Sequence, residues 1–399
     1  MNEIYKITDL DHFGRGIINV NGKIGFVNNA FVGDEVTIEI LEQKKDFLVC
    51  NVKEYKSKSK LRKASYCKYC NACGGCDIGE LKYEEQLKYK KLRIRNILDK
   101  YLKESIKIND IIYSNDLCYR NKITLHVENG ELGLFEKNSN VLVPIDFCLL
   151  VNPKINEIIS ELKKFVKNKK IDSIVIKCSN LDQVMLVFYG NVDADDVLNT
   201  FSCESIFIND KCIKCKYIYE KLGNYKFALS KDSFFQVNRF NTINLYNEVV
   251  RFIKKGSYKS ALDLYCGTGT IGIFVSKYVG NIIGIELVSD AIESANVNKK
   301  INKIKNIEFV CGKVENFINK IKSVDLVITD PPRKGMDKKT VNEILKLNPN
   351  SIIYISCNIM TLVRDLNILK NKYKIIELTP VDMFPNTYHC ESITILERR

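Results

Sequence analysis

From about residue 231 onward, the chain alternates short apolar runs with segments of helical pattern. The runs "SALDLYCG", "NIIGIELV", "VDLVITDPP" and "SIIYISCN" each predict a buried strand, and the stretches between them predict helices. This alternation favours parallel strands, because each helical crossover returns the chain to the same end of the sheet. We therefore predict a doubly wound α/β domain over residues 231–399, with helices on both faces of a mostly parallel sheet.

The first of these strands runs into a glycine-rich turn, "LDLYCGTGTIG". Gly267 and Gly269 allow a tight turn and a close approach of the backbone to a ligand. Glu286 ends the next strand, where a carboxylate can bind a ribose diol, although it could also be a solvated strand end. The loop lacks the Lys-Ser/Thr pair that cradles phosphates, and Asp263 would repel a pyrophosphate. The pattern thus favours S-adenosylmethionine over a dinucleotide.

Two later strands of this domain end in reactive residues. Asp330 ends one strand, in "ITDPPRKG", and Cys357 ends the following one, in "IIYISCN". His389 and Glu391 lie at the start of the final strand, in "VDMFPNTYHCESITIL". Most cysteines at strand ends are small buried fillers, and Glu391 could cap a loop or pair with a lysine. Because ligands of open α/β sheets bind at this edge, the combination predicts a nucleophile and a base beside a methyl donor.

A thiol, a methyl donor and a base suit one reaction. Carbon 5 of uracil is too weak a nucleophile to attack a methyl sulfonium directly. Addition of a thiolate to carbon 6 forms an enolate, which makes carbon 5 nucleophilic. After methyl transfer, a base removes the proton from carbon 5 and elimination frees the cysteine. Methylation of cytosine or of a small molecule is the alternative use of the same chemistry.

These residues resemble a known family, the RNA uracil-5-methyltransferases, and the likeness to its iron–sulfur branch acting on 23S ribosomal RNA runs over nearly the whole chain. "DPPRKG", followed after sixteen residues by "IIYISCNIMT", fits the nucleophile signature of the family. "VDMFPNTYHCE" fits the second signature with two departures. Asn386 stands where His, Gln or Tyr is usual, and Cys390 stands where an apolar residue is usual.

The resemblance implies roles for particular residues. Cys357 is expected to be the nucleophile and Glu391 the base. Five residues are expected to contact S-adenosylmethionine: Gln236 in "SFFQVN", Tyr265, Thr270, Glu286 and Asp330. Thr270 stands where relatives more often have asparagine. Asp330 is also expected to help place the uracil.

The stretch "CKYCNACGGC" contains four cysteines. Their spacing is too compressed for two zinc knuckles, whereas iron–sulfur clusters use closely spaced thiolates plus a remote ligand. A zinc site is the alternative. The family pattern, C-x5-C-G-G-C plus a distant cysteine, implies that Cys67, Cys73, Cys76 and Cys148 hold a 4Fe–4S cluster. Cys70 is left without a role.

The amino-terminal residues 1–56 have alternating apolar positions and an Asn21-Gly22 hairpin signal, which predict a small β-barrel. The resemblance implies that this is a TRAM domain, an oligonucleotide-binding barrel. Residues 57–230 are predicted to form a β-rich central domain that contains the cluster and recognises RNA. Within it we expect a hairpin at Asn129-Gly130 and a helix near residues 81–102 that packs on the catalytic domain.

The bulk properties agree with an RNA-binding enzyme. The chain of 399 residues has a net charge of +13, which suits a polyanionic partner, although a lysine-rich background would produce the same excess. No run of eighteen apolar residues and no signal-peptide pattern is present, so we expect a cytoplasmic monomer without membrane contact. The alternatives are a transfer RNA uracil-5-methyltransferase and a non-catalytic RNA-binding protein.

Overall fold

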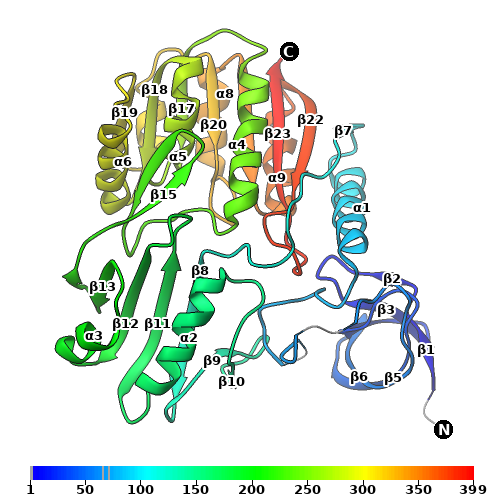
Figure 1. The fold of residues 1–399 in the computed structure, drawn as a ribbon. Coiled ribbons are helices and arrows are strands. Elements are labelled where there is room, and N and C mark those ends of the chain that lie inside the picture. The colour runs from blue at the N-terminus through cyan, green and yellow to red at the C-terminus, as the bar shows by residue number, and fades with distance from the viewer. Residues whose placement is uncertain (1–2, 65–66, 71) are drawn as a thin grey trace.

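The computed structural model describes residues 3–64, 67–70 and 72–399. Figure 1 shows three parts: an α/β domain with a large central sheet, a β-rich central domain below it, and a curled amino-terminal sheet beside the central domain. In the part of the chain that the structure describes, no helix combines the length and the apolar character needed to cross a membrane.

The α/β domain contains an eight-stranded sheet in the order β19-β18-β17-β20-β21-β23-β22-β7. Neighbouring strands are parallel except for β23, which runs antiparallel to both β21 and β22. The predicted doubly wound, mostly parallel sheet is therefore confirmed. Its strands are β7 (Lys107–Ile108), β17 (Tyr258–Leu264), β18 (Val279–Glu286), β19 (Ile307–Cys311), β20 (Leu326–Thr329), β21 (Ser351–Ser356), β22 (Tyr373–Val381) and β23 (Glu391–Arg398).

Two apolar cores cover the two faces of this sheet. Every residue of β21 is buried, because helices pack on both of its sides. Side chains of α4, α5 and α6 belong to one core, and those of α1, α7, α8 and α9 belong to the other. The helices are α1 (Tyr83–Tyr101), α4 (Arg239–Ile253), α5 (Thr270–Val275), α6 (Ser289–Ile301), α7 (Val314–Ile318), α8 (Lys338–Leu347) and α9 (Ile359–Leu369), with a 3₁₀ turn η1 (Ser276–Tyr278).

The segment between the amino-terminal sheet and the central domain adds two elements to the α/β domain. Ile94 and Leu98 of α1 are buried in the same core as Leu362 of α9. The short strand β7 then pairs with β22 and extends the sheet by one strand. Figure 1 shows α1 standing at the β22 side of the domain, above the amino-terminal sheet.

The central domain is built on a seven-stranded sheet in the order β10-β9-β8-β11-β12-β13-β14. Asn129 and Gly130, both at positive φ, form the predicted two-residue turn between β8 and β9, so this hairpin is confirmed. The elements are β8 (Lys122–Glu128), β9 (Glu131–Phe135), β10 (Leu142–Pro144), α2 (Pro153–Phe165), β11 (Lys170–Cys178), β12 (Val184–Asn191), α3 (Ala194–Thr200), β13 (Ser205–Ile208) and β14 (Lys211–Lys214), followed by a separate hairpin of β15 (Ile218–Leu222) and β16 (Tyr225–Leu229).

The amino-terminal part is a six-stranded sheet in the order β1-β5-β6-β4-β3-β2, curled around its own small apolar core. Asn21 and Gly22 form the predicted turn between β3 and β4, with positive φ at both residues. The strands are β1 (Tyr5–Lys6), β2 (Asp9–Leu10), β3 (Gly16–Val20), β4 (Lys23–Asn28), β5 (Glu35–Gln43) and β6 (Phe47–Ser57).

A buried ion pair fixes α1 to the end of β22. Lys90 Nζ lies 2.6 Å from Asp382 Oδ1, and neither side chain is exposed to solvent. Tyr83 donates a hydrogen bond to the other carboxylate oxygen of Asp382, at 3.0 Å, and Lys90 also donates to the carbonyl of Phe384, at 3.0 Å. The charges are thus neutralised and hydrogen-bonded, as a buried ion pair requires.

We expect Lys90→Met to lower the free energy of unfolding by about 3–5 kcal/mol, because it leaves the buried Asp382 carboxylate without its counter-charge. Lys88→Met on the same helix is the control. Lys88 pairs with Glu85 at an exposed position, so its loss should leave the free energy of unfolding nearly unchanged. Urea unfolding of the full chain measures both. Equal effects of the two substitutions would contradict a stabilising role for the buried ion pair. The double substitution Lys90→Met/Asp382→Leu should recover part of the lost unfolding free energy, because it removes both charges.

Candidate active site

The predicted site residues follow strands that end at the same edge of the large sheet. In the registers, Leu264 at the end of β17 pairs with Ile285 of β18 and with Thr329 of β20, and Thr329 in turn pairs with Tyr354 of β21. Because these strands are parallel, the residues at or just after their carboxyl ends lie at one edge. These residues are Tyr265, Glu286, Asp330 and Cys357.

The antiparallel strand β23 brings a further residue to this edge. Ile355 pairs with Ile393 and Ser356 pairs with Ser392. The pairing ends there, and the residues immediately beyond the last pair are Cys357 and Glu391. Glu391 is only 2% exposed, whereas Cys357 is half-buried and accessible to a ligand. The sequence placed both residues near the sheet edge, and the register makes them cross-strand neighbours.

The glycine loop between β17 and α5 has the backbone geometry of a ligand-binding turn. Gly267 and Gly269 have φ of +53° and +75°. A Cβ on Gly269 would lie 2.4 Å from the ring of Phe309, while a Cβ on Gly267 would meet no atom within 4 Å. The loop is therefore closely packed on its inner side and open over Gly267, as a loop that approaches a ligand must be.

A buried carboxylate supports the same loop. Asp263 accepts a hydrogen bond from the backbone N–H of Gly272 at 2.9 Å, and its other carboxylate oxygen has no partner among the described residues. Burial raises the pKa of Asp263 to about 7. Glu286 accepts hydrogen bonds from the N–H groups of Gly267, Leu287 and Val288, so its carboxylate lies against the loop where a ribose would bind.

The remaining expected contacts to S-adenosylmethionine surround this loop. Thr270, the first residue of α5, shares a 2.9 Å hydrogen bond with the hydroxyl of Tyr246. Tyr265 has a positive φ of +60°, a strained conformation for a tyrosine. Gln236 Nε2 lies 3.5 Å from Asp330 Oδ2, at the limit of a hydrogen bond, and links the incoming loop to the sheet edge.

The sequence analysis missed two features at the loop before Gln236, one that supports the loop and one within it. Lys177 lies in β11, and its ammonium group donates hydrogen bonds to the carbonyls of Ser230, Lys231 and Ser233. This lysine interrupts an apolar strand, "SIVIKC", which was the available signal. Phe234 is 66% exposed, so the loop presents an aromatic ring suited to stacking on an RNA base.

The acidic residues of the site have raised pKa values, mainly because they are buried. Burial and the neighbouring Asp330 raise the pKa of Glu391 well above its ordinary value, and burial raises that of Asp330 to about 7. Burial, Glu391 and Asp330 together raise the pKa of the Cys357 thiol to about 12, while Arg333 acts in the opposite direction. Without RNA bound, the cysteine is therefore held mainly as the thiol.

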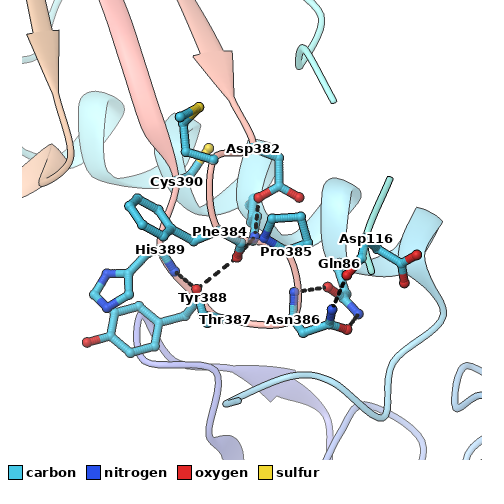
Figure 2. Close-up of polar contacts among 12 residues, drawn as sticks. Gln86, Asp116, Asp382, Phe384, Pro385, Asn386, Thr387, Tyr388, His389 and Cys390 are labelled. Carbon is cyan, nitrogen blue, oxygen red and sulfur yellow. Dashed lines mark hydrogen bonds and ion pairs between the residues drawn. The ribbon is translucent and has the colours of Figure 1, made fainter. Parts of the chain in front are cut away.

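His389 and Cys390 lie in the loop just before Glu391 (Figure 2). Burial, followed by Arg333, lowers the pKa of His389 to about 4, so its imidazole is neutral at pH 7. Cys390 is 4% exposed and belongs to the apolar core that α1 shares with α9. It occupies the place of an apolar residue and acts as one, which explains this departure from the family signature.

The cysteine-rich stretch lines a cavity of about 620 Å³ between the central sheet and the loop of His389. Cys67, Cys73, Cys76 and Cys148 all line this cavity, and so does Cys70. Within the described residues, no three cysteine, histidine or acidic side chains are placed to share a single metal ion. Burial, with contributions from the other cavity cysteines, raises the pKa of the Cys76 thiol well above its ordinary value.

Comparisons with known proteins agree with this site. The sequence family of tRNA (Uracil-5-)-methyltransferases matches residues 203–399. A protein of Clostridium acetobutylicum described as an uncharacterised RNA methyltransferase is 32% identical, covering 99% of this chain and 96% of the relative. One of Staphylococcus aureus MSSA476 with the same description is 30% identical, covering 98% and 96%. The crystal structure of Pyrococcus abyssi tRNA (uracil-54, C5)-methyltransferase with S-adenosyl-L-homocysteine has a TM-score of 0.82 and 26% identity, covering 99% of this chain and all of that one.

The sheet, the glycine loop and these relatives define an S-adenosylmethionine-dependent methyltransferase. The chain belongs to the RNA (uracil-5-)-methyltransferase family, and it transfers a methyl group from S-adenosylmethionine to carbon 5 of uracil in RNA. The predicted enzyme class, methyl donor and RNA partner are confirmed, and the non-catalytic alternative is wrong.

The raised pKa values predict that methylation accelerates with pH. As the expected base, Glu391 would accept a proton only when ionised, so activity should be lost as pH falls through its raised pKa. As the expected nucleophile, Cys357 would react as the thiolate, whose fraction rises about tenfold per pH unit below a pKa of about 12. Single-turnover rates should therefore increase between about pH 6.5 and pH 9, and a flat or falling profile would contradict this electrostatic account.

The reactivity of the Cys357 thiol can also be measured directly. Glu391→Gln should speed the alkylation of Cys357, because it removes a nearby negative charge. Peptide mass spectrometry measures the rate of alkylation.

Proposed function

We propose that this enzyme methylates a uridine of 23S ribosomal RNA through a covalent adduct between Cys357 and carbon 6 of the uracil, with Glu391 as the base. One observation supports this mechanism above the others: the β21–β23 register ends at the Ser356–Ser392 pair, so Cys357 and Glu391 lie directly beyond it on adjacent strands, at the edge where Asp330 follows β20. A nucleophile and a base on adjacent strands can reach the two neighbouring ring carbons of one uracil.

The proposed reaction balances without any further reactant. The Cys357 thiolate forms a bond to carbon 6, and the electron pair of the carbon 5–carbon 6 double bond moves into the carbonyl at carbon 4. Carbon 5 of this enolate then takes the methyl group, whose bond to the sulfonium of S-adenosylmethionine breaks. The Glu391 carboxylate removes the proton from carbon 5, the double bond reforms, and Cys357 leaves as the thiolate.

Other residues of the edge are proposed to position the reactants. The carboxylate of Glu286, at the glycine loop, is placed to bind the ribose of S-adenosylmethionine, with further contacts from Gln236, Tyr265, Thr270 and Asp330. Gln236 Nε2 lies within weak hydrogen-bond distance of Asp330 Oδ2. We propose that the polar groups of these two residues also bind the edge of the uracil. A uracil stacked within RNA must be flipped out to reach Cys357, and the exposed Phe234 is available to stack on a base.

The same cavity cysteines support a proposal of a 4Fe–4S cluster held by Cys67, Cys73, Cys76 and Cys148. The backbone N–H of Gly75 donates to Cys73 Sγ at 3.3 Å, a contact that stabilises a charged sulfur. Asn156 fixes the Cys148 backbone through hydrogen bonds of 2.9 and 3.0 Å. Thiols spread around a cavity fit a cluster of several irons better than one zinc ion. The cluster would join two distant segments of the central domain.

The assignment to ribosomal RNA rests on this cysteine pattern, which resembles the 23S branch. The similarity to the Pyrococcus enzyme, which acts on tRNA, supports the alternative of a transfer RNA substrate. We further propose that the curled amino-terminal sheet is a TRAM domain, and that it and the net charge of +13 provide affinity for RNA phosphates. We expect the enzyme to act as a cytoplasmic monomer.

Mass mapping of 5-methyluridine tests the substrate. Deleting the gene should remove 5-methyluridine from 23S ribosomal RNA and leave transfer RNA unchanged. The wild-type gene should restore the modification, whereas Cys357→Ala should not, because no adduct can form. Loss of the modification from transfer RNA alone would favour the alternative substrate. Full restoration by Cys357→Ala would rule out the covalent mechanism.

Iron analysis tests the cluster ligands. Cys73→Ser, purified without oxygen, should lose the iron and the absorption of the cluster near about 400 nm, since one of four thiolates is missing. Cys70→Ser is the matched control and should keep both, although Cys70 lines the same cavity. Loss of iron in both variants would mean that the four ligands are chosen wrongly. Zinc in place of iron in the wild-type protein would exclude the cluster.

A further inference from the structure

The loop that leads to the proposed base has no regular structure, so its contacts must hold it in place. It comprises residues 382–390 between β22 and β23, and Glu391 follows it directly. Figure 2 shows this loop beside α1, with Asn386 facing Gln86 and Asp116. The loop begins at the buried Asp382 and ends at the buried Cys390, and Asn386 lies midway between them.

Asn386 has an unusual backbone conformation and is fully buried. Its φ is +68°, in the left-handed region that asparagine adopts more easily than most other residues. In this conformation its carbonyl accepts hydrogen bonds from the N–H groups of Asp77 and Ile78, at 3.0 and 3.1 Å. These two residues follow Cys76 directly. The cysteine-rich segment is therefore bonded to the loop of the base through main-chain atoms.

Asn386 is also held by the amide group of Gln86 on α1. The Asn386 N–H donates to Gln86 Oε1 at 2.8 Å, and Gln86 Nε2 donates to Asn386 Oδ1 at 3.1 Å. The side-chain NH₂ of Asn386 donates to the carbonyl of Asp116 at 2.7 Å. Gln86 is fully buried as well. Buried amides matched in this way specify one position, because any shift leaves donors and acceptors unpaired.

Hydrogen bonds within the loop hold Thr387, next to Asn386, and His389, two residues before Glu391. Thr387 donates from Oγ1 to the carbonyl of Phe384 at 2.9 Å, and the His389 N–H approaches Thr387 Oγ1 at 3.3 Å. The Phe384 carbonyl is in turn bonded to Lys90. Cys390, the residue before Glu391, is fixed in the apolar core. A displacement of Asn386 should therefore be transmitted along the short loop to the backbone of Glu391.

We propose that Asn386 is a positioning residue for proton removal by Glu391, and that it couples the cysteine-rich segment and α1 to the base. The inference rests on the proposed roles of Cys357 and Glu391. Binding of RNA and attack by Cys357 depend on other elements, so a displaced loop should slow the step after methyl transfer. The expected consequence is an enzyme that methylates its RNA but releases it slowly.

Single-turnover reactions on ribosomal RNA tritiated at carbon 5 of uracil test this. Methyl incorporation reports the transfer step, tritium release reports proton removal, and a denaturing gel reveals the covalent adduct. For Asn386→Ala we expect methyl incorporation within about threefold of wild type. Tritium release should fall by about 100-fold, the loss typical of a catalytic group misplaced by about 1 Å, and the adduct should accumulate. Gln86→Met, which removes both hydrogen bonds between the Gln86 amide and Asn386, should show the same pattern. It tests the positioning role if Asn386→Ala does not fold.

Two comparison variants separate the possible outcomes. Asn348→Ala places alanine at another positive φ, +53°, at the end of α8, and should react like wild type; this controls for backbone strain. Glu391→Gln should trap the adduct outright. Suppose that Glu391→Gln traps the adduct, but Asn386→Ala and Gln86→Met lose methyl transfer and tritium release to the same extent. The positioning role of Asn386 is then wrong, while the proposed function stands. If Glu391→Gln traps no adduct, the base is misassigned and the inference fails with it.

Discussion

The reversed direction of β23 is the constraint on which the site depends. A strand inserted antiparallel between β21 and β22 enters the sheet at the edge where its parallel neighbours end. Its first residue, Glu391, therefore lies beside Cys357 although 33 positions separate them in the sequence. A parallel strand would have placed Glu391 at the opposite edge, away from the glycine loop. The position of the proposed base thus follows from a property of the sheet and not from local sequence.

This arrangement requires the loop before β23 to be fixed, and its main supports come from α1 and the cysteine-rich segment, about 300 positions earlier in the sequence. The Lys90–Asp382 pair, the Gln86 amide and the N–H groups of Asp77 and Ile78 hold its beginning and its middle. Burying an ion pair costs solvation energy, so such a pair adds little net stability but is expensive to break. It suits a place where one geometry matters more than overall stability. The cysteine-rich segment and the catalytic edge are therefore parts of one structural unit.

The protonation of the groups at the catalytic edge follows from their burial close to one another. Burial raises the pKa values of Cys357, Asp330 and Glu391, and the two carboxylates raise that of the thiol further, which disfavours a free thiolate while no substrate is bound. This protects the cysteine from side reactions and leaves the carboxylates basic enough to accept a proton. The exposed Arg333 provides an opposing positive charge at the rim of the site.

The sequence by itself determined the local elements and the chemistry. Hydrophobic periodicity specified the α/β domain, the turn pairs Asn21-Gly22 and Asn129-Gly130 specified two hairpins, and spacing brought out Cys357, Asp330 and Glu286 as strand-end residues. These signals are local, because each depends on a few neighbouring side chains. Only the tertiary structure decided which distant segments meet. It brought β7 to the α/β domain, placed Lys177 under the Gln236 loop, gathered five cysteines around one cavity and enclosed Asn386 between Gln86 and the cysteine-rich segment. Such contacts join residues between 53 and 300 positions apart, and their energies depend on burial and geometry that no local pattern encodes.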